Sequence, residues 1–283
     1  MGQKILITGS SGFIGKNLKA ALQKKGFLIE EFNSTQGDIA TVKLNFKNIS
    51  HVFHLAGKSF VPDSWKDPEE FKRVNAEGTR NVLEFCKEAG ASITFISSYI
   101  YGIPHTLPIS EMHPVNPSNP YAESKKLAED LCLEYSKKFK IPVTIIRPFN
   151  IYGKNQPDHF LIPEIIKQLN DDSLSEITLQ DLNPKRDYLY MDDFVNAIIV
   201  LFENKSQGIY NLGSGYSMSV QEIVDTVFKV SGGSKQVKSN QAVRKNEIPD
   251  VVADIFKVKK ETGWEPKVSF EEGIKRIIEP EKN

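Results

Sequence analysis

The sequence has few residues of the kinds that mark secreted, metal-binding or membrane-spanning chains. Among its 283 residues are only two cysteines, Cys86 and Cys132, which fall in separate helix-like segments. We therefore expect reduced, buried thiols in a cytoplasmic protein, and no metal site. The longest apolar runs, such as residues 197–202, are too short to cross a bilayer. Strand-like residues begin near Lys4, so we also expect no signal peptide.

An excess of charge is absent as well. The 36 Lys and Arg residues are balanced by 36 Asp and Glu residues. No net field would therefore draw the chain to nucleic acid or to a membrane surface, and neither is expected as a partner.

A glycine-rich turn is the first positive signal. The apolar run KILIT over residues 4–8 is followed by GSSGFIG over residues 9–15, and apolar residues then recur at helical spacing until Gly26. This order of strand, turn and helix is typical of a doubly wound sheet, where glycines let the backbone approach a pyrophosphate at a helix N-terminus. We therefore expect Gly9, Gly12 and Gly15 to hold a dinucleotide.

Strand and helix patterns then alternate along the chain. Parallel βα alternation of this kind predicts an α/β fold whose binding residues lie at the carboxyl ends of the strands. The predicted strands are residues 27–32, 51–57, 93–97, 143–147 and 176–180, and the predicted helices are residues 68–89, 121–139, one opening at 160–166 and one near 192.

Tyr121 and Lys125 stand four residues apart at the start of a helix-like segment, and hence on one helix face. An ammonium beside a phenol stabilises the phenolate, so we expect Lys125 to lower the pKa of Tyr121 toward neutrality. Such a phenol would exchange a proton with a ketone or a carbinol. The pattern alone arises by chance in many proteins, and its meaning depends on the rest of the chain.

Several ordered motifs give that context, and with them the chain resembles the extended short-chain dehydrogenase/reductases that act on nucleotide sugars, also called the NAD-dependent epimerase/dehydratase family. Within this family, the run HLAGKSFVPDSWKDP is most similar to the GDP-4-keto-6-deoxymannose reductases. The resemblance implies a Rossmann-type doubly wound parallel sheet with a smaller C-terminal α/β substrate domain. The matching segments are TGSSGFIG (8–15), HLAG (54–57), VNAEGT (74–79), SSYIYG (97–102), YAESK (121–125), RPFNIYG (147–153), RDYLYMDDF (186–194), YNLGSG (210–215) and ETGWEP (261–266).

The resemblance also implies the catalytic residues. Tyr121 and Lys125 match the family's Tyr and Lys directly. Alignment on the Tyr-Gly pair makes Ser97 the catalytic hydroxyl, whereas alignment on the strand gives that role to Ser98. We expect Tyr121 to pass the proton while the cofactor passes the hydride.

Three positions narrow the range of expected reactions. The family's sugar dehydratases carry an Asp-Glu pair after the catalytic hydroxyl, where this chain has Ser98 and Tyr99, so 4,6-dehydration is disfavoured. The epimerising reductases commonly use a Cys and a His. Tyr99 occupies the Cys position, and His159 falls one residue from the His position. Reduction and simple 4-epimerisation are compatible with these residues.

The resemblance assigns a cofactor site for NADP or NAD. Asn33 stands at the family position of the acidic residue that bonds the ribose of NAD. An asparagine there favours NADP because it does not repel a 2′-phosphate. Glu31, two residues earlier, is the alternative that would favour NAD. The expected cofactor-binding residues are Gly9, Gly12, Phe13, Ile14, Gly15, Asn33, Asp38, Ile39, Leu55, Ala56, Gly57, Tyr121, Lys125 and Pro148.

The same resemblance places the substrate and the domains. Residues 1–151 with about 187–212 would bind the dinucleotide, and about 152–186 with 213–283 would bind the nucleotide sugar. The helices 68–89 and 121–139 resemble the pair that forms a four-helix bundle in homodimers of this family. The apolar residues Val82, Phe85, Leu127 and Leu131 recur at spacings that would build such a seam, and the alternative is that they face their own sheet. The expected substrate-binding residues are Ser98, Tyr99, Asn150, Arg186 and Arg244.

Reduction of a nucleotide-linked 4-keto-6-deoxyhexose, a step of polysaccharide biosynthesis, is therefore the expected function. The first alternative is a nucleotide-sugar 4-epimerase with permanently bound NAD. The second is a non-catalytic regulator that senses NADP. Such regulators usually lose the Tyr or the Lys, and this chain keeps both.

Overall fold

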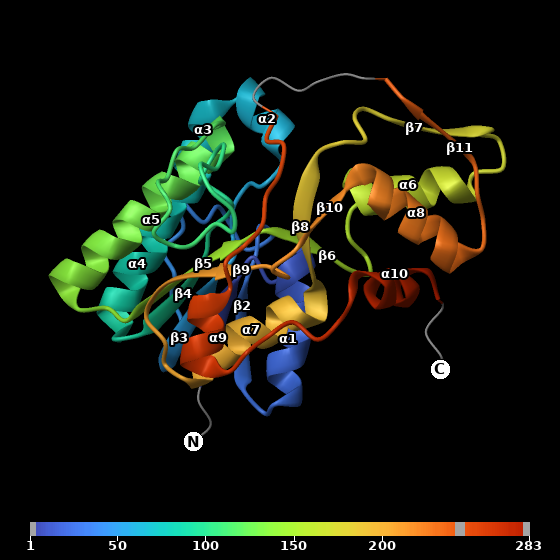
Figure 1. Cartoon of the computed structure of the whole chain (residues 1–283). Helices are drawn as coiled ribbons and strands as arrows, with labels where there is room; N and C mark the ends of the chain where they lie inside the picture. The colour runs from blue at the N-terminus through green and yellow to red at the C-terminus, as the bar shows by residue number, and fades with distance from the viewer. Residues whose placement is uncertain (1–3, 241–246, 280–283) are drawn as a thin grey trace. The chain divides into compact units, whose positions relative to one another are not determined.

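The short apolar runs of the sequence form one central sheet. A computed structural model describes residues 4–240 and 247–279, and its six-stranded sheet has the order β2-β1-β3-β4-β5-β9 (Figure 1). The four pairs among the first five strands are parallel. The strands are β1 (Lys4–Thr8), β2 (Leu28–Phe32), β3 (Ile49–His54), β4 (Ser92–Ile96), β5 (Val143–Pro148) and β9 (Gly208–Leu212). The predicted doubly wound parallel sheet is confirmed.

The strand order places a topological switch between β1 and β3. The chain adds β2 on one side of β1 and then crosses back to add β3 on the other side of β1. Ligands of such sheets bind at the carboxyl ends of the strands next to this switch. The glycine turn comes directly after β1, and residues 55–57 come directly after β3.

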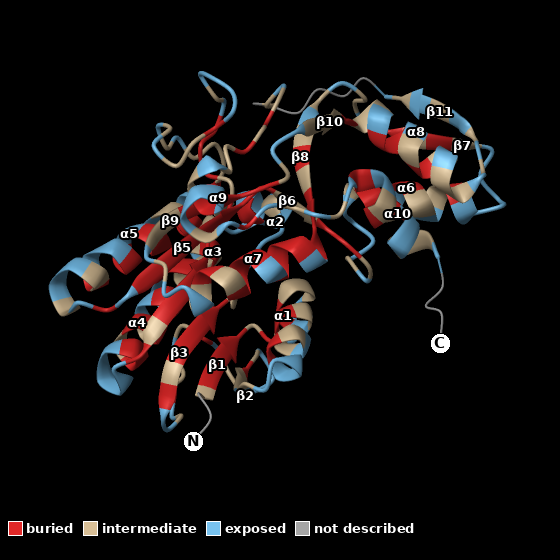
Figure 2. Cartoon of the chain, turned by 60° about the horizontal axis from the view of Figure 1, so that its bottom comes forward, coloured by how far each residue is buried: buried red, intermediate tan, exposed pale blue. Residues whose placement is uncertain are grey.

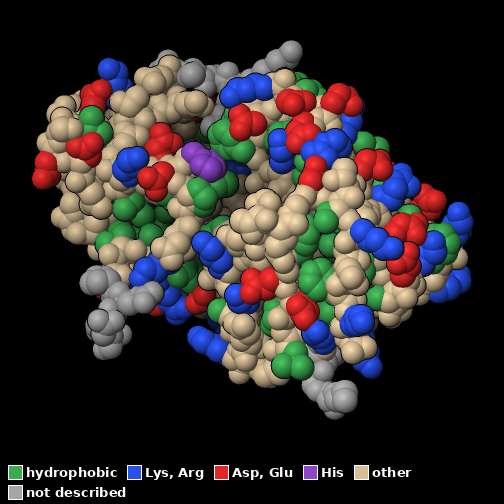
Figure 3. Space-filling model, turned by 180° about the vertical axis from the view of Figure 1, so that it is seen from behind, with side chains coloured by type: hydrophobic (Ala, Val, Ile, Leu, Met, Phe, Trp, Pro, Cys, Tyr) green, Lys and Arg blue, Asp and Glu red, His purple; other side chains and the backbone are tan. Residues whose placement is uncertain are grey.

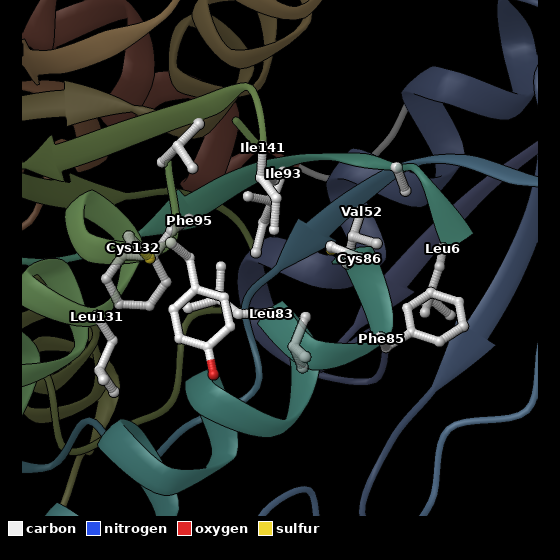
Figure 4. Close-up of a cluster of buried hydrophobic side chains, with 14 of the residues drawn as sticks. Leu6, Val52, Leu83, Phe85, Cys86, Ile93, Phe95, Leu131, Cys132 and Ile141 are labelled. Atoms are coloured by element: carbon white, nitrogen blue, oxygen red, sulfur yellow. The ribbon is translucent and has the colours of Figure 1, made fainter. Parts of the chain in front are cut away.

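Helices cover both faces of this sheet. Alternate strand residues such as Leu6, Val52 and Phe95 pack with Cys86 and Cys132 of the helices in one buried cluster (Figure 4). On the opposite face, Phe53 packs edge to face on Phe202 with ring centroids 5.3 Å apart. The helices are α1 (Phe13–Lys24), α2 (Val61–Lys66), α3 (Pro68–Lys72), α4 (Gly78–Ala89), α5 (Pro120–Phe139) and α7 (Met191–Glu203). In Figure 2, β1, β3 and α7 are largely buried.

The predicted helix over residues 68–89 is continuous but not uniform. Between α3 and α4, residues Arg73–Glu77 form one π-helical turn. Such turns insert an extra residue into a helix and occur frequently at functional sites.

The chain divides into two compact units. Unit 1 comprises Met1–Gly102, Glu111–Pro148 and Val195–Asn211, and unit 2 comprises Ile103–Ser110, Phe149–Phe194 and Leu212–Asn283. Unit 2 has a three-stranded sheet of order β10-β8-β6 and a parallel pair β11-β7. Its elements are β6 (Asn150–Tyr152), α6 (Leu161–Asn170), β7 (Glu176–Leu179), β8 (Lys185–Tyr190), β10 (Ser217–Ser219), α8 (Val220–Ser231), β11 (Gln236–Ser239), α9 (Phe256–Thr262) and α10 (Phe270–Ile278).

Neither a membrane span nor a cluster of metal ligands occurs in the described part of the chain. No helix over residues 4–240 and 247–279 is both long and apolar enough to cross a membrane. Over the same residues, no group of three or more His, Cys, Asp or Glu side chains is placed to hold a metal ion. Figure 3 shows Lys and Arg side chains interspersed with Asp and Glu on one face, in keeping with the balanced composition.

Candidate active site

The glycine turn after β1 is shaped for close approach. Gly9 has a φ of +74°, and a Cβ at that position would lie 2.6 Å from the backbone nitrogen of Ala56. A Cβ at Gly15 would overlap the carbonyl oxygen of Gly9. Gly12, the N-cap residue of α1, has no side chain that could accept hydrogen bonds from the free N–H groups of the first helical turn. These N–H groups and the helix dipole suit a pyrophosphate, with Phe13 and Ile14 in that first turn.

A buried chain of side chains fixes the end of β3 next to this turn. The Thr8 hydroxyl lies 2.7 Å from His54 Nδ1, and the Thr79 hydroxyl lies 3.0 Å from His54 Nε2. Burial lowers the pKa of His54 to about 3, so the ring is neutral at pH 7. His54 therefore positions the adjoining residues Leu55, Ala56 and Gly57.

Two serine hydroxyls lie at the end of β4. The side chains of Ser97 and Ser98 are 2% and 6% exposed. Neither hydroxyl has a hydrogen-bond partner in the part of the chain that the structure describes. Buried polar groups are nearly always paired. These two hydroxyls therefore fit a site in which a bound ligand supplies their hydrogen-bond partners.

Tyr121 lies in the first turn of α5, close to these serines. The side chain of Asn119 caps the helix by accepting from the N–H of Ala122 at 2.9 Å, and Pro120 starts it. Burial raises the pKa of Tyr121 to about 12, and the neighbouring Ser98 hydroxyl opposes this shift. The expectation that the pKa of Tyr121 is lowered toward neutrality is therefore wrong in this structure. Desolvation outweighs the other influences on the phenol.

Lys125 lies one turn further along α5, beneath the end of β4. Its ammonium donates to the carbonyl oxygen of Ile96 at 2.8 Å and lies 4.8 Å from the centre of the Phe95 ring. Burial lowers the pKa of Lys125 to about 8. Ile96 immediately precedes Ser97, so the structure brings Ser97, Ser98, Tyr121 and Lys125 together at one strand end.

Asn75 is a central residue of this site, although no expected role was assigned to it from the motifs. It lies in the π-helical turn, and its amide donates to the Ser124 hydroxyl at 2.8 Å and to the Lys58 carbonyl at 3.0 Å. Its oxygen accepts from the Lys58 N–H at 2.8 Å, and a Cβ at Gly57 would lie 2.6 Å from that oxygen. Asn75 thus ties α5 to the loop after β3. The sequence signal that could have identified Asn75 is its place in the family segment VNAEGT.

A buried ion pair is the second feature that the sequence did not reveal. The guanidinium of Arg147 on β5 binds the Glu129 carboxylate of α5 through contacts of 2.6 to 3.2 Å. The side chains are 4% and 1% exposed. Arg147 also donates to the Tyr101 hydroxyl at 2.9 Å. Tyr121, Lys125 and Glu129 share one face of α5, so this pair anchors the helix that carries the site.

The expected ribose and adenine residues form local contacts after β2. Asn33 closes a turn, because its side-chain oxygen accepts from the N–H and hydroxyl of Thr35 at 3.0 and 2.7 Å. Asp38 pairs with Arg73 at 2.5 Å and Ile39 is buried. The backbone N–H of Ala40 and then Arg73 hold the pKa of the Asp38 carboxyl below its usual value. Pro148 is buried at the end of β5.

The expected substrate residues are divided between the units. Tyr99 lies in unit 1, where its hydroxyl donates to the Gly102 carbonyl at 2.6 Å. In unit 2, the Asn150 amide donates to the Asp187 carbonyl at 3.1 Å. Arg186 donates to the Ile248 carbonyl at 2.6 Å and pairs with the Glu247 carboxylate. Arg244 lies outside the described residues.

Known proteins share this arrangement of strands and motifs. The family model described as GDP-mannose 4,6 dehydratase matches residues 30–277. The chain belongs to that family. Its members are NAD(P)-dependent enzymes that modify nucleotide sugars, in the group of extended short-chain dehydrogenase/reductases.

Individual relatives span several reactions. The chain is 29% identical to GDP-6-deoxy-D-mannose reductase of Pseudomonas aeruginosa, covering 98% of this chain and 97% of that protein. It is 31% identical to UDP-glucose 4-epimerase of Lactobacillus helveticus, covering 93% and 92%. The recognised family is confirmed, whereas these identities leave the particular reaction open.

Solved structures agree with the fold. RMD from Pseudomonas aeruginosa complexed with NADPH has a TM-score of 0.89 at 28% identity, covering 98% of this chain and 97% of that one. MoeE5 in complex with UDP-glucuronic acid and NAD has a TM-score of 0.86 at 26% identity, covering 96% of each chain. The Rossmann-type prediction is thereby confirmed by structure as well as by topology.

Proposed function

We propose that the protein is an NAD(P)-dependent oxidoreductase that reduces a nucleotide-linked 4-keto-6-deoxyhexose. The observation that carries the proposal is the meeting of a protonated phenol, a buried ammonium and two unpartnered serine hydroxyls at the end of β4. This is a proton-donating site for a carbonyl oxygen.

The residues at the sheet switch fit a nicotinamide dinucleotide. Gly9 and Gly15 leave room for a pyrophosphate, and the start of α1 supplies N–H donors. Asp38, Ile39 and the loop Leu55, Ala56 and Gly57 would line the adenosine and the linking phosphates. Lys125 would hold the nicotinamide ribose, with Pro148 nearby. When bound, the cofactor would supply or accept the hydride.

The proton comes from this chain. The pKa of Tyr121 is about 12, so the phenol is protonated at neutral pH and is a donor in the direction of reduction. One of the two serines would hold the substrate oxygen: Ser97 by the order of the family motif, Ser98 by its influence on the phenol. The charge of Lys125 would stabilise the phenolate that forms as the proton leaves.

The proposed substrate class depends on the family and on the residues after the catalytic hydroxyl. Ser98 and Tyr99 occupy the positions of an acid/base pair, and neither carries a carboxyl group, which disfavours elimination of water. Arg186, Asn150 and Arg244 would bind the nucleotide diphosphate and the sugar, since guanidinium groups bind phosphates bidentately. The resemblance of HLAGKSFVPDSWKDP to the GDP-4-keto-6-deoxymannose reductases favours a GDP-linked sugar.

A 4-epimerase with bound NAD is the second candidate, because the chain is 31% identical to a UDP-glucose 4-epimerase over 93% of its length. The deciding experiment offers a panel of nucleotide-4-ketosugars with NADPH or NADH and analyses products by mass spectrometry. A reductase consumes one reduced cofactor per product. Interconversion without net consumption would establish the epimerase instead. No turnover with any substrate would favour a non-catalytic NADP sensor.

We also propose a cytoplasmic homodimer. Of the expected seam residues, Leu127 is 44% exposed, which leaves it available to a second subunit. Val82, Phe85 and Leu131 are buried in the unit 1 core, so that part of the seam was wrong. They face their own sheet.

A further inference from the structure

The Lys125 ammonium lies in the interior of unit 1 without a carboxylate against it. The residue is 5% exposed, and its ammonium contacts the Ile96 carbonyl oxygen and the Phe95 ring. In the part of the chain that the structure describes, Lys125 takes part in no ion pair. Since a buried cation without a counter-charge is costly, an anion further away is needed to keep Lys125 charged.

Glu129 is the carboxylate next along the same face of α5. It follows Lys125 by one helical turn, and side chains four residues apart on a helix are neighbours. Both oxygens of its carboxylate accept hydrogen bonds from the Arg147 guanidinium. This carboxylate therefore has one cation in direct contact and a second cation one turn away.

Arg147 gives the Glu129 carboxylate a fixed place. From β5 it donates to the Tyr101 hydroxyl at 2.9 Å, and its guanidinium carbon lies 5.0 Å from the centre of the Tyr101 ring. The Tyr101 hydroxyl in turn donates to the side-chain oxygen of Asn211 on β9 at 2.6 Å. The network joins α5, β5 and β9, so the charge of Glu129 is held rigidly relative to Lys125.

Glu129 is also the anion that acts on Lys125 near pH 8. Burial lowers the pKa of Lys125 to about 8, and Cys132 and then Glu129 oppose this shift. Burial raises the pKa of the Cys132 thiol well above its usual value, so that thiol carries no charge at pH 8. Charges in a protein interior are weakly screened, so a carboxylate one turn away still stabilises an ammonium.

Apart from Arg147, the other titratable side chains around Lys125 in the described residues are neutral in this pH range. Burial raises the pKa of Tyr121 to about 12, lowers that of His54 to about 3 and raises that of Cys86. The titratable side chains of this region are Tyr121, Glu129 and Cys132 of α5, His54 of β3, Cys86 of α4 and Arg147 of β5.

We propose that Glu129 is a positioning residue of the reaction, whose carboxylate is fixed by Arg147 and keeps the Lys125 ammonium charged across one turn of α5. This inference rests on the proposed function, because it assumes that the Lys125 charge assists proton transfer from Tyr121. The pair then does more than anchor the helix. It sets the pH above which the site loses its cation.

The test measures the pKa of Lys125 in the full chain by NMR of lysine labelled at Cε, so it does not depend on turnover. The Lys125 signal is assigned by its absence in Lys125→Arg. Glu129→Gln should lower this pKa by about one pH unit, because Lys125 loses its anion and keeps the repulsion of Arg147. Glu129→Asp, which retains the charge, should stay close to the wild type.

The double variant Glu129→Gln/Arg147→Met separates charge from stability. Without a buried unpaired guanidinium it should recover much of the stability lost in Glu129→Gln. Its Lys125 pKa should nevertheless remain below that of the wild type, between the two. The alkaline decline of kcat/KM should move with the pKa in every variant. Asp130→Asn, on the exposed side of the same helix, is the matched control and should change neither quantity.

An unchanged Lys125 pKa in Glu129→Gln would overturn the proposal. A double variant that regains the wild-type pKa together with its stability would overturn it too, since the pair would then act through structure alone. A pKa that shifts while the decline of kcat/KM stays in place would reject the role in the reaction and leave the proposed function standing. A wild type without turnover on any substrate would reject the proposed function, and the NMR titration would then decide the coupling alone.

Discussion

At the scale of single residues, burial shifts two neighbouring groups of α5 in opposite directions with the same physical cause. The phenol of Tyr121 resists becoming an anion, so its pKa rises to about 12. The ammonium of Lys125 resists staying a cation, so its pKa falls to about 8. At neutral pH the site thus holds a neutral acid beside a cation that is close to losing its proton.

The lowered pKa of Lys125 sets the expected pH dependence. Lys125 is charged below about pH 8 and loses its charge as pH rises through that value. If the charged form assists proton transfer, kcat/KM for reduction should fall above about pH 8. Lys125→Arg, whose guanidinium stays charged, should be slower but should lack this alkaline decline. A wild-type profile that stays flat well above pH 8 would contradict a role for the Lys125 charge.

Replacing Tyr121 by Phe tests the proton donor. Turnover should fall by a factor on the order of 10² or more, the usual scale of a lost acid/base group. Binding of 5′-ADP should be unchanged, because the phenol does not hold the pyrophosphate. Ser97→Ala and Ser98→Ala, measured separately, should differ widely, since one hydroxyl contacts the substrate oxygen. Near-normal rates in Tyr121→Phe would reject the assignment.

At the scale of elements, the Arg147–Glu129 pair joins β5 to α5 in the interior of unit 1. Glu129→Gln should destabilise the protein by about 3–5 kcal/mol, because it leaves the Arg147 guanidinium buried without its counter-charge. Urea unfolding measures this change. Adding Arg147→Met should recover much of the loss.

Asp130→Asn is the matched control, because the adjacent Lys126–Asp130 pair lies on the exposed side of the same helix. It should leave stability near that of the wild type. If Glu129→Gln were as mild as this control, the pair would not be the anchor of α5.

The exposed side of α5 also carries the expected dimer contact. Light scattering at micromolar concentration should give a dimer for the wild type and a monomer for Leu127→Arg, because a charge would replace the exposed apolar residue of the proposed contact. Phe256→Arg is the control, since Phe256 is 67% exposed on α9, which belongs to unit 2. A monomeric wild type would contradict the proposed homodimer.

At the scale of the whole molecule, periodicity and turn residues predicted most of the fold and part of the site. Strand β1, the glycine turn and α1 are local, so KILIT, GSSGFIG and Gly26 mark them in sequence. The Asn75 network and the Arg147–Glu129 pair join segments that are 17 to 49 residues apart. No local pattern records such contacts. The pKa of Tyr121 was mispredicted for the same reason, since burial depends on everything packed around it.

The strand order has a consequence for synthesis on the ribosome. The last strand of the central sheet, β9, pairs with β5, yet the segment Phe149–Phe194 of the other unit is translated between them. At roughly 5–20 residues per second, the buried strand β5 waits several seconds with an unpaired edge. A nascent chain stalled near Pro148 would expose that apolar edge to other nascent chains. We therefore expect the β5 edge to be most open to such pairing in the interval before Leu212 emerges.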